Sequence, residues 1–363
     1  MFQIAEGAVR AYYLFDVADT IDLTEMRSLT GDARAPAELP LRPHASPAYL
    51  QFPVPPLVAN LGDDDIGDAH CALRLKIYDY GVMSLRLTFD ARGSWSDLIA
   101  LADRARTDEH IARFAESTVL RIRDEHAHAF DEPHTPLIED YLILEINRFS
   151  ENVDADTLLD DHFPDLASLL LGERRKLSPS ESEEALRTRF SYYEDDLTIV
   201  QWDTAFIYDR PESRRAIEDI LEFANSQLLE LRTYDARLDR ELDVIYKLQS
   251  DAPGPSFRGR AESEKAAALR YLIVDVLELI DRSSNALKVV GDAYYARIYR
   301  AAAKRLGLAD WQRQIDAKLA SVGDVYRFFS DQARSSRDLF LEWIVIALIA
   351  LEVVIGVATL VHH

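Results

Sequence analysis

The second half of the chain carries a repeating pattern of apolar positions that predicts long helices. Between Glu212 and Ser250 there is neither glycine nor proline. Apolar residues recur there at spacings that alternate between four and three, at positions 217, 221, 224, 228, 231, 238, 242 and 245. Such a 3.5-residue repeat is typical of a coiled-coil seam, and only Asp235 interrupts it. The pattern predicts one helix ~58 Å long at 1.5 Å per residue.

Two further seams follow this helix. The stretch 251–260, DAPGPSFRGR, holds two prolines and two glycines, and we expect it to break the helix. Apolar positions then continue at helical spacing over 269–301 and again over 308–329. Three long helices joined by short breaks predict an antiparallel, coiled-coil-like stalk over 211–338, with its hairpin turn at 251–260.

A nearly continuous apolar segment, FLEWIVIALIALEVVIGVATLV, covers the 22 residues 340–361. As a helix it would be ~33 Å long, which is enough to cross the hydrocarbon core of a bilayer. Fourteen of its residues are Phe, Leu, Ile or Val; at roughly −0.5 kcal/mol each, they outweigh a mid-bilayer carboxylate at ~+3 kcal/mol. We therefore expect a transmembrane helix over 339–361, with Glu342 and Trp343 at the interface and Glu352 near the midplane.

The charges around this segment predict its orientation. Three arginines precede it and only two histidines follow it, so the positive-inside rule puts the large N-terminal part in the cytoplasm. The first residues, MFQIAEGAVR, lack the features of a secretory signal peptide. The expected localisation is the cytoplasmic side of the inner (cell) membrane, single-pass and tail-anchored, with a buried core helix as the alternative. Glu352 either marks a helix–helix contact in a homo-oligomer or is tolerated in its protonated form.

The first two hundred residues mix two periodicities. Strand-like alternation occurs at 8–16, 71–81, 82–90, 141–149 and 196–209, and helical spacing occurs at 95–105 and 108–130. The acidic stretch 62–68, GDDDIGD, is expected to be a loop. Because the strands cluster rather than alternate regularly with helices, residues 1–210 are predicted to form a mixed α/β head of the α+β class.

The charge balance narrows the choice of partners. The chain has 63 acidic and 41 basic residues, a net charge of −22. Such a surface repels phosphate backbones, which argues against DNA as a partner. One stretch nevertheless gathers six basic residues: Arg297, Arg300, Lys304, Arg305, Arg313 and Lys318. They predict either a solvated helix face paired with internal carboxylates or a site for an acidic partner, RNA on a ribosome included.

Motifs that carry catalysis are scarce. The chain has no phosphate-binding glycine loop and no GxSxG elbow, and Cys71 is its one cysteine. The stretch 124–134 holds four side chains capable of binding a metal: His126, His128, Asp131 and His134. Residues two apart do not share a helix face, so both histidines can reach one ion only where the helix has ended. The open alternatives are a polar helix end and a metal-dependent enzyme; we expect no cofactor and favour a non-enzymatic role.

Four stretches taken together resemble a known family. They are IYDYGVMSLRL (77–87), IYDRPE (207–212), LDRELDVIYKLQ (238–249) and LEWIVIALIALEVVIG (341–356). In this order they resemble the Required for Meiotic Nuclear Division family, also called the YagE-type domain of unknown function. The motif residues that match in the last stretch are Leu341, Glu342, Trp343, Glu352 and Val353. Those that match in the first two stretches are Tyr80, Gly81, Asp209, Pro211 and Glu212. Structural roles are expected for them: glycine where a backbone comes close, and an aspartate cap with proline in the first helical turn.

The resemblance implies a membrane-tethered, non-enzymatic scaffold or assembly protein. Members of that family are linked to meiotic division and to translation of organelle-encoded proteins at the mitochondrial inner membrane, where oligomers are thought to tether ribosomes. A bacterial inner-membrane member is therefore expected, homo-oligomeric, with an unidentified protein partner and a ribosome as one hypothesis. In that topology Phe257, Arg258 and Arg260 would touch headgroups from the membrane-proximal turn, with an ordinary solvated turn as the alternative.

Overall fold

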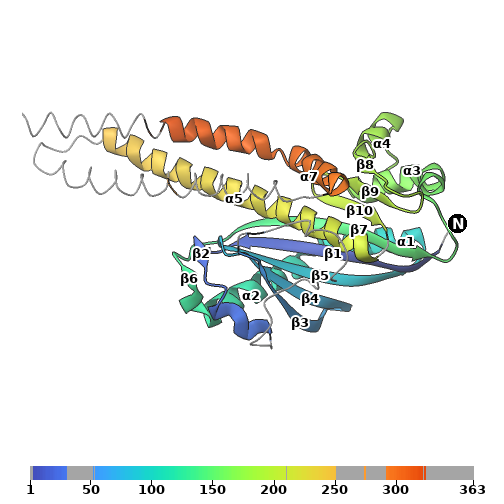
Figure 1. Ribbon diagram of the computed structural model, residues 1–363, viewed down its shortest axis with the longest axis horizontal. Helices are drawn as coiled ribbons and strands as arrows, with labels where there is room; N and C mark the ends of the chain where they lie inside the picture. The colour runs from blue at the N-terminus through green and yellow to red at the C-terminus, as the bar shows by residue number, and fades with distance from the viewer. Residues whose placement is uncertain are drawn as a thin grey trace, which may run out of the picture. The chain divides into compact units, whose positions relative to one another are not determined.

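The computed structural model describes residues 3–30, 52, 54–209, 211–250, 274, 292–321 and 323 (Figure 1). The chain separates into two compact units. The first comprises Met1–Thr233 with Arg282–Trp311, and the second Tyr234–Asp281 with Gln312–His363. The division falls inside a helix, after Thr233, whereas the sequence places it at residue 210; that boundary stays a prediction.

The first unit is built on a sheet whose eight described strands have the order β3-β4-β5-β1-β7-β10-β9-β8. The strands are β1 (Ile4–Asp16), β3 (Leu57–Ile66), β4 (Ala69–Ile77), β5 (Val82–Gly93), β7 (Leu137–Phe149), β8 (Arg189–Phe190), β9 (Leu197–Val200) and β10 (Thr204–Tyr208). Neighbours are antiparallel except β7 and β10, which run parallel. A separate short ladder joins β2 (Thr20–Ile21) to β6 (Phe130–Asp131).

Strand β1 lies near the middle of the sheet and is covered on both faces. Val9 and Tyr13 belong to one buried cluster, whereas Tyr12 and Leu14 belong to another. Successive side chains on a strand point to opposite faces, so the two clusters are the two sides of the sheet. A strand buried on both sides reads as a continuous apolar run, and the AYYLF of β1 has that character.

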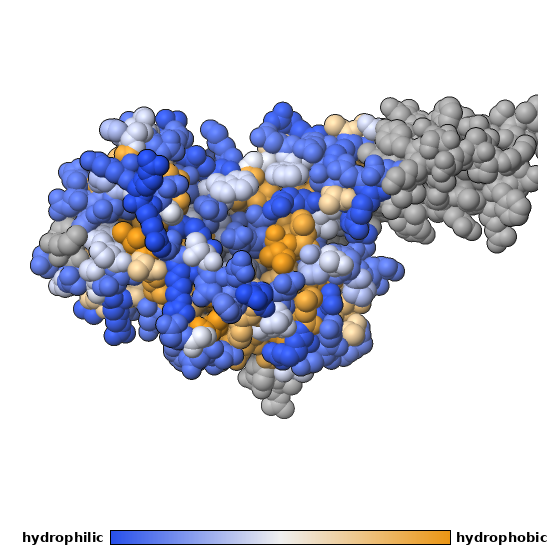
Figure 2. Space-filling view, turned by 180° about the vertical axis from the view of Figure 1, so that it is seen from behind, coloured by the Kyte–Doolittle hydropathy of each residue, from blue (hydrophilic) through white to orange (hydrophobic). Residues whose placement is uncertain are grey.

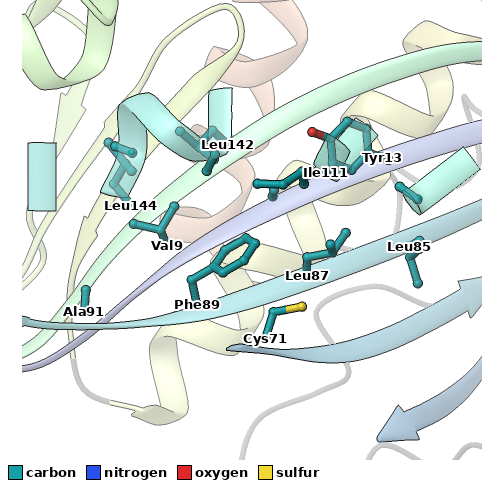
Figure 3. Packing of buried hydrophobic residues seen from close by; sticks show 14 of the residues in the cluster. Val9, Tyr13, Cys71, Leu85, Leu87, Phe89, Ala91, Ile111, Leu142 and Leu144 are labelled. Atoms are coloured by element: carbon teal, nitrogen blue, oxygen red, sulfur yellow. The ribbon is translucent and has the colours of Figure 1, made fainter. Parts of the chain in front are cut away.

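The first face is apolar and is covered by three helices: α1 (Trp95–Thr107), α2 (Glu109–Glu125) and α3 (Ala155–Leu171). Figure 3 shows Val9, Leu87 and Leu144, from three strands, in the same buried cluster as Ile111 of α2. Helix α1 begins with a capping box, in which Ser94 accepts the amide of Asp97 and the Asp97 carboxylate accepts the amide of Ser94. We call this side of the sheet the apolar face.

The remaining short elements lie around this face and at the end of the sheet. They are η1 (Glu25–Thr30), η2 (Ala127–Ala129) and α4 (Pro179–Ala185). Helix α3 is kinked at His162, two residues before Pro164. A proline ring inside a helix clashes with the preceding turn, which accounts for the kink.

The second face carries the first part of α5 (Pro211–Ser250) and α7 (Ala293–Arg305) (Figure 1). Every residue of α5 from Ala216 to Leu231 is buried. The hydroxyl of Tyr299 on α7 donates a hydrogen bond to Gln227 of α5. We call this side of the sheet the helix-α5 face.

The described part of the second unit is helical: the end of α5 from Tyr234, residue 274, and residues 312–321 with 323. The ammonium group of Lys318 lies 2.6 Å from a carboxylate oxygen of Asp235 and 2.6 Å from one of Asp239. Leu238 and Ile315 are buried in it. Asp235, the polar member of the predicted seam, is therefore one of two acids that pair with Lys318.

The predicted fold class is wrong. The described residues form a mixed α/β structure around one large sheet, with no long coiled-coil stalk evident among them. The apolar repeat of 217–231 is real, but it packs on the sheet. A heptad pattern tells which face of a helix is buried and does not tell what buries it, so the stalk was the wrong inference.

The predicted tail anchor is wrong for the part of the chain that the structure describes. Within that part, no helix is both long enough and apolar enough to cross a bilayer. The segment 339–361 with Glu342, Trp343 and Glu352 lies outside the described residues, as do Phe257, Arg258 and Arg260. The membrane-tethered scaffold and its single-pass localisation at the inner membrane are therefore not supported.

Candidate functional site

Charged side chains are concentrated between the helix-α5 face of the sheet and α5. Arg10, Lys76 and Arg86 come from strands β1, β4 and β5, and Glu145 comes from β7. The register of these strands brings the four residues to the same face of the sheet, because residues that pair across neighbouring strands share a face. Helix α5 adds Arg214, Glu218, Asp219 and Glu222, and no member of the set is more than 17% exposed. We call these eight residues the ionic layer.

Glu145 is the centre of one half of the ionic layer. It is fully buried, and each of its oxygens has one arginine: Arg10 Nε lies 2.6 Å from Oε2, and Arg214 Nη1 lies 2.6 Å from Oε1. Burial raises the pKa of Glu145, although the neighbouring Arg10 opposes the shift. Burial alone would lower the pKa of Arg10, but the carboxylates of Glu218 and Glu145 outweigh it and raise that pKa.

Helix α5 supplies acids that pair with the cations of the sheet. The Lys76 ammonium donates to Asp219 Oδ1 at 2.8 Å and also to Glu222. Arg86 Nη1 donates to Glu218 Oε2 at 3.1 Å. Burial would lower the pKa of Lys76, but the two carboxylates raise it, so the group stays charged.

Polar contacts continue along α5 beyond the ionic layer. The hydroxyl of Tyr80 lies 2.8 Å from Ser226 Oγ, and its ring stacks on Tyr78 with centroids 5.0 Å apart. Arg232 donates to Glu139 of β7. Burial raises the pKa of both tyrosines well above 10. A polar strip therefore follows the helix from Arg214 to Arg232.

The chemistry open to the ionic layer is limited, because it is closed and neutral. It holds four cations and four anions, with no surplus charge to attract a ligand. The same stretch of α5 buries Ile217, Ile220, Leu221, Phe223, Ala224 and Leu228. Burying each larger apolar side chain stabilises by ~1.5–3 kcal/mol, so displacing the helix would cost far more than a ligand contact returns. Buried ion pairs add little net stability, and we interpret the layer as the device that fixes the register of α5.

A different cluster lies at the edge of the sheet, where loop 191–196 joins β8 to β9. Tyr192 and Tyr193 are 61% and 63% exposed, with ring centroids 4.8 Å apart at 77°. Tyr192 also meets Tyr294 of α7 edge to face at 5.2 Å, and Tyr294 meets Tyr295 at 5.7 Å. We call these four residues the tyrosine corner.

The loop that presents the two exposed tyrosines is fixed by its backbone. The carboxylate of Asp196, which is buried, accepts the amide of Tyr192 at 2.8 Å and that of Tyr193 at 2.7 Å. The amide of Ala155, at the start of α3, donates to the Glu194 carbonyl at 2.8 Å. Short side chains that bind nearby amides stabilise turns, so the exposed rings stand on an ordered loop.

The surroundings of the tyrosine corner are acidic. Burial raises the pKa of Tyr295, and the carboxylates of Asp209 and Asp292 raise it further. Arg297 places its guanidinium over the ring of Tyr294, 5.5 Å from the centroid. Polar residues dominate the surface seen in Figure 2, with smaller apolar patches between them.

The four residues of 124–134 do not converge in the structure. Helix α2 ends at Glu125, so the helix has ended before His126 and His128, as binding of one ion by both would require. The three histidines nevertheless have different neighbours, each at 3.3 Å: Ser28 for His126, Glu25 for His128 and Asp16 for His134. Asp131 belongs to strand β6. Across the described ranges, no three His, Cys, Asp or Glu side chains are placed to hold a metal ion.

The motif residues lie at a hairpin and at a helix start. Gly81 has φ +96°, and a Cβ there would come within 1.8 Å of the Ala18 carbonyl oxygen, so only glycine fits. Asp209 is buried just before α5, and Pro211 is the first residue of that helix. The side chain of Glu212 lies outside the described residues.

The six basic residues of 297–318 are divided between the two units, and some of them are paired with acids. Arg305 contacts Glu184, and Lys318 binds its two aspartates within the second unit. Arg297, Arg300, Lys304 and Arg313 are exposed. The six residues therefore do not form one patch within either unit.

Comparison with known proteins places the chain in a family. Residues 6–214 match the family described as "Uncharacterized protein MJ0711, N-terminal domain". The chain belongs to this family. It is similar to the uncharacterized protein MJ0711 of Methanocaldococcus jannaschii, with 27% identity over 213 residues, 59% of this chain and 65% of that protein. The chain thus spans less than two thirds of that relative's length, and no solved structure matches.

The resemblance to the Required for Meiotic Nuclear Division family that the sequence suggested is wrong, because the chain belongs to the MJ0711 family. No comparison points to the Required for Meiotic Nuclear Division or YagE-type family, and the relative is archaeal, against the expected bacterial origin. The motifs misled because a glycine at a tight hairpin and a proline at a helix start meet local backbone demands that recur in unrelated folds. The stretch 341–356 lies outside the described residues.

Neither the ionic layer nor the tyrosine corner was found from the sequence. Arg10, Lys76 and Arg86 interrupt the apolar alternation of their strands on one face, which is a usable sign of a charged interface. The run SYYEDD at 191–196 joins two aromatic residues to three acids, and only its last residue falls within the predicted strand or hairpin of 196–209.

Proposed function

We propose that this member of the MJ0711 family is a protein-binding module and that the tyrosine corner is its contact surface. The observation that carries the proposal is the pair Tyr192 and Tyr193, both more than 60% exposed on a loop ordered by the buried Asp196. Tyrosine is enriched in binding hot spots because it offers a large, amphipathic surface with few rotatable bonds.

The order of the loop supports the proposal energetically. Binding costs roughly 0.5–1.5 kcal/mol for each flexible side chain that becomes immobilised, and more for a loop that must be ordered. Here Asp196 holds both backbone amides before any partner arrives. Few large apolar side chains are exposed among the described residues; Trp202 and Ile138 are two of them. Tyr192 and Tyr193 also belong to this set, and they are adjacent in the chain.

Site-specific photo-crosslinking tests the proposal. A photoreactive phenylalanine analogue replaces Tyr193 in the full chain, expressed in the cells that make the protein, and the matched control replaces Arg175, exposed between α3 and α4. We expect a discrete adduct from position 193 and none from 175. Equal labelling from both positions, or none from 193, would contradict the proposal.

Reconstitution with the identified protein completes the test. Replacing Tyr192 or Tyr193 by alanine should weaken purified binding roughly 30-fold or more for a hot-spot residue. Trp202→Ala removes an equally exposed aromatic ring from the β9–β10 turn and is expected to leave affinity unchanged. The homo-oligomer expected from the sequence stays a prediction, and mass determination of the purified chain tests it.

A further inference from the structure

We infer that the segment recognised by the tyrosine corner is cationic and carries arginine. The inference rests on the proposed function and adds the chemical class of the partner. Three features of the corner support it: a guanidinium already seated on one of its rings, the carboxylates around it, and the charge of the whole chain.

The first feature is the contact between Arg297 and Tyr294. The guanidinium carbon lies 5.5 Å from the ring centroid, within the distance at which a cation is attracted to an aromatic face. Tyr294 is buried against Tyr192, whose own ring is exposed. The corner therefore already binds one arginine through a ring face, and Tyr192 and Tyr193 offer further ring surface of the same kind to solvent.

The second feature is the set of negatively charged carboxylates around the tyrosine rings. Glu194 is exposed in the same loop, Asp195 is partly exposed beside it, and Asp209 and Asp292 act on the neighbouring Tyr295. The Asp196 carboxylate binds the loop backbone, whereas the contact of Glu194 within the described part of the chain is made by its backbone carbonyl. Carboxylates beside aromatic faces suit a guanidinium, which forms paired hydrogen bonds with the acid and stacks on the ring.

The third feature is the net charge of the chain, which indicates whether the partner is a second copy or a different protein. A second copy would also offer exposed cations, among them Arg300 and Lys304 on α7. Each chain has a net charge of −22, so two copies repel each other over long range, whereas a basic segment is attracted. The same charge disfavours nucleic acid. The partner expected at the tyrosine corner is therefore a basic, arginine-bearing segment of another protein.

Calorimetry with synthetic peptides tests the inference on the purified full chain. The probe is a short glycine–serine peptide with spaced arginines, and its matched control carries citrulline, which keeps the shape and removes the charge. We expect binding of the arginine peptide that weakens as salt rises, and at least tenfold weaker binding of the citrulline peptide. A lysine peptide should bind less tightly than the arginine peptide, because it lacks the planar fork.

Variants locate the binding. Tyr193→Ala should weaken the arginine peptide roughly tenfold, Tyr193→Phe should retain affinity because the ring face remains, and Trp202→Ala should have no effect. Glu194→Gln should reduce the affinity and its salt dependence, whereas Glu173→Gln, an exposed acid on the α3–α4 connection, should not. Thermal unfolding of each variant shows that the loss is not a folding defect.

The outcomes separate this inference from the function on which it rests. Equal binding of arginine and citrulline peptides, or equal losses in Tyr193→Ala and Trp202→Ala, would overturn the cationic assignment. A discrete crosslink at position 193 without any peptide binding would leave the protein-binding function standing and remove the arginine-bearing class. A dimer that Tyr193→Ala dissolves would identify a second copy as the occupant and likewise overturn the inference.

Discussion

The two faces of the central sheet are both closed by helices, yet they are closed by different chemistry. On the apolar face, α1, α2 and α3 cover Val9, Leu87 and Leu144. On the helix-α5 face, ion pairs lie among the apolar contacts. Adjacent residues show the contrast: Leu144 and Glu145 are successive, both fully buried, and point to opposite sides.

Apolar contacts and ion pairs make different contributions to the fold. Apolar burial is non-directional, so many helix placements on the apolar face would bury similar area. Ion pairs with hydrogen-bond geometry tolerate one arrangement, and a shift of α5 by one residue would separate Lys76 from Asp219. The apolar face supplies stability, and the ionic layer supplies the position of α5.

The largest effect is expected at Glu145. Replacing Glu145 by alanine leaves Arg10 and Arg214 buried without their shared carboxylate, which should cost about 3–5 kcal/mol in the free energy of unfolding. Urea unfolding monitored by circular dichroism measures the loss. A loss below about 1 kcal/mol would show that the layer is solvated rather than buried.

The neighbouring substitution Leu144→Ala sharpens the comparison. It removes a fully buried side chain from the apolar face and should cost about 2–5 kcal/mol. The two variants should differ in their dependence on pH, because only Glu145 titrates. Parallel pH profiles for both variants would contradict the distinction between the faces.

A smaller effect is expected at Asp196. Asp196→Ala leaves the amides of Tyr192 and Tyr193 without their acceptor and should cost about 1–3 kcal/mol. Glu194→Ala, on an exposed residue of the same loop, is the matched control. Hydrogen exchange of loop 191–196 should accelerate only in the Asp196 variant, and unchanged exchange would show that the loop is held by other contacts.

The pH dependence of stability should differ in sign between buried and exposed acids. The pKa of Glu145 is raised above 4.5 in the folded chain, so the folded state takes up a proton while the unfolded state is still ionised. This group alone therefore stabilises the fold as pH falls from the raised pKa toward 4.5, and Glu145→Gln should abolish that component. The capping Asp97 and Asp154 have lowered pKa values from hydrogen bonds with Ser94 and Thr157, so their stabilisation is present above 3.8 and lost as pH falls further.

The smallest effect is expected at Arg300. It is exposed on α7, and the structure gives it no ion pair within the described ranges. Arg300→Ala should change the free energy of unfolding by less than about 0.5 kcal/mol. A larger loss in urea unfolding would point to a partner that the basic stretch has in solution.

Local pattern located much of the sheet and several helices. The predicted strands 8–16 and 82–90 lie within β1 and β5, and the predicted helix 95–105 lies within α1. Alternation and helical spacing are local properties, which is why they could be found. Strand β3 was missed because its acidic end, 62–66, falls in the stretch 62–68 that the sequence predicts to be a loop. Strand β3 lies at the edge of the sheet, where charged residues are tolerated.

The functional surfaces depend on contacts that no local pattern contains. Arg10 and Glu145 are 135 residues apart, and their meeting requires the pairing of β1 with β7. Tyr192 and Tyr294 come together only when α7 packs beside β9. The apolar repeat of α5 was visible in the sequence, but the sheet that it covers was not.

Amide hydrogen exchange of Glu145→Gln against the unmodified chain tests the central comparison most directly. The substitution keeps the volume and removes the charge that Arg10 and Arg214 share. We expect faster exchange along the described α5 amides from Arg214 to Arg232, with α1 and α2 on the apolar face unchanged. Equal acceleration on both faces, or none in α5, would contradict the assignment of helix placement to the ionic layer.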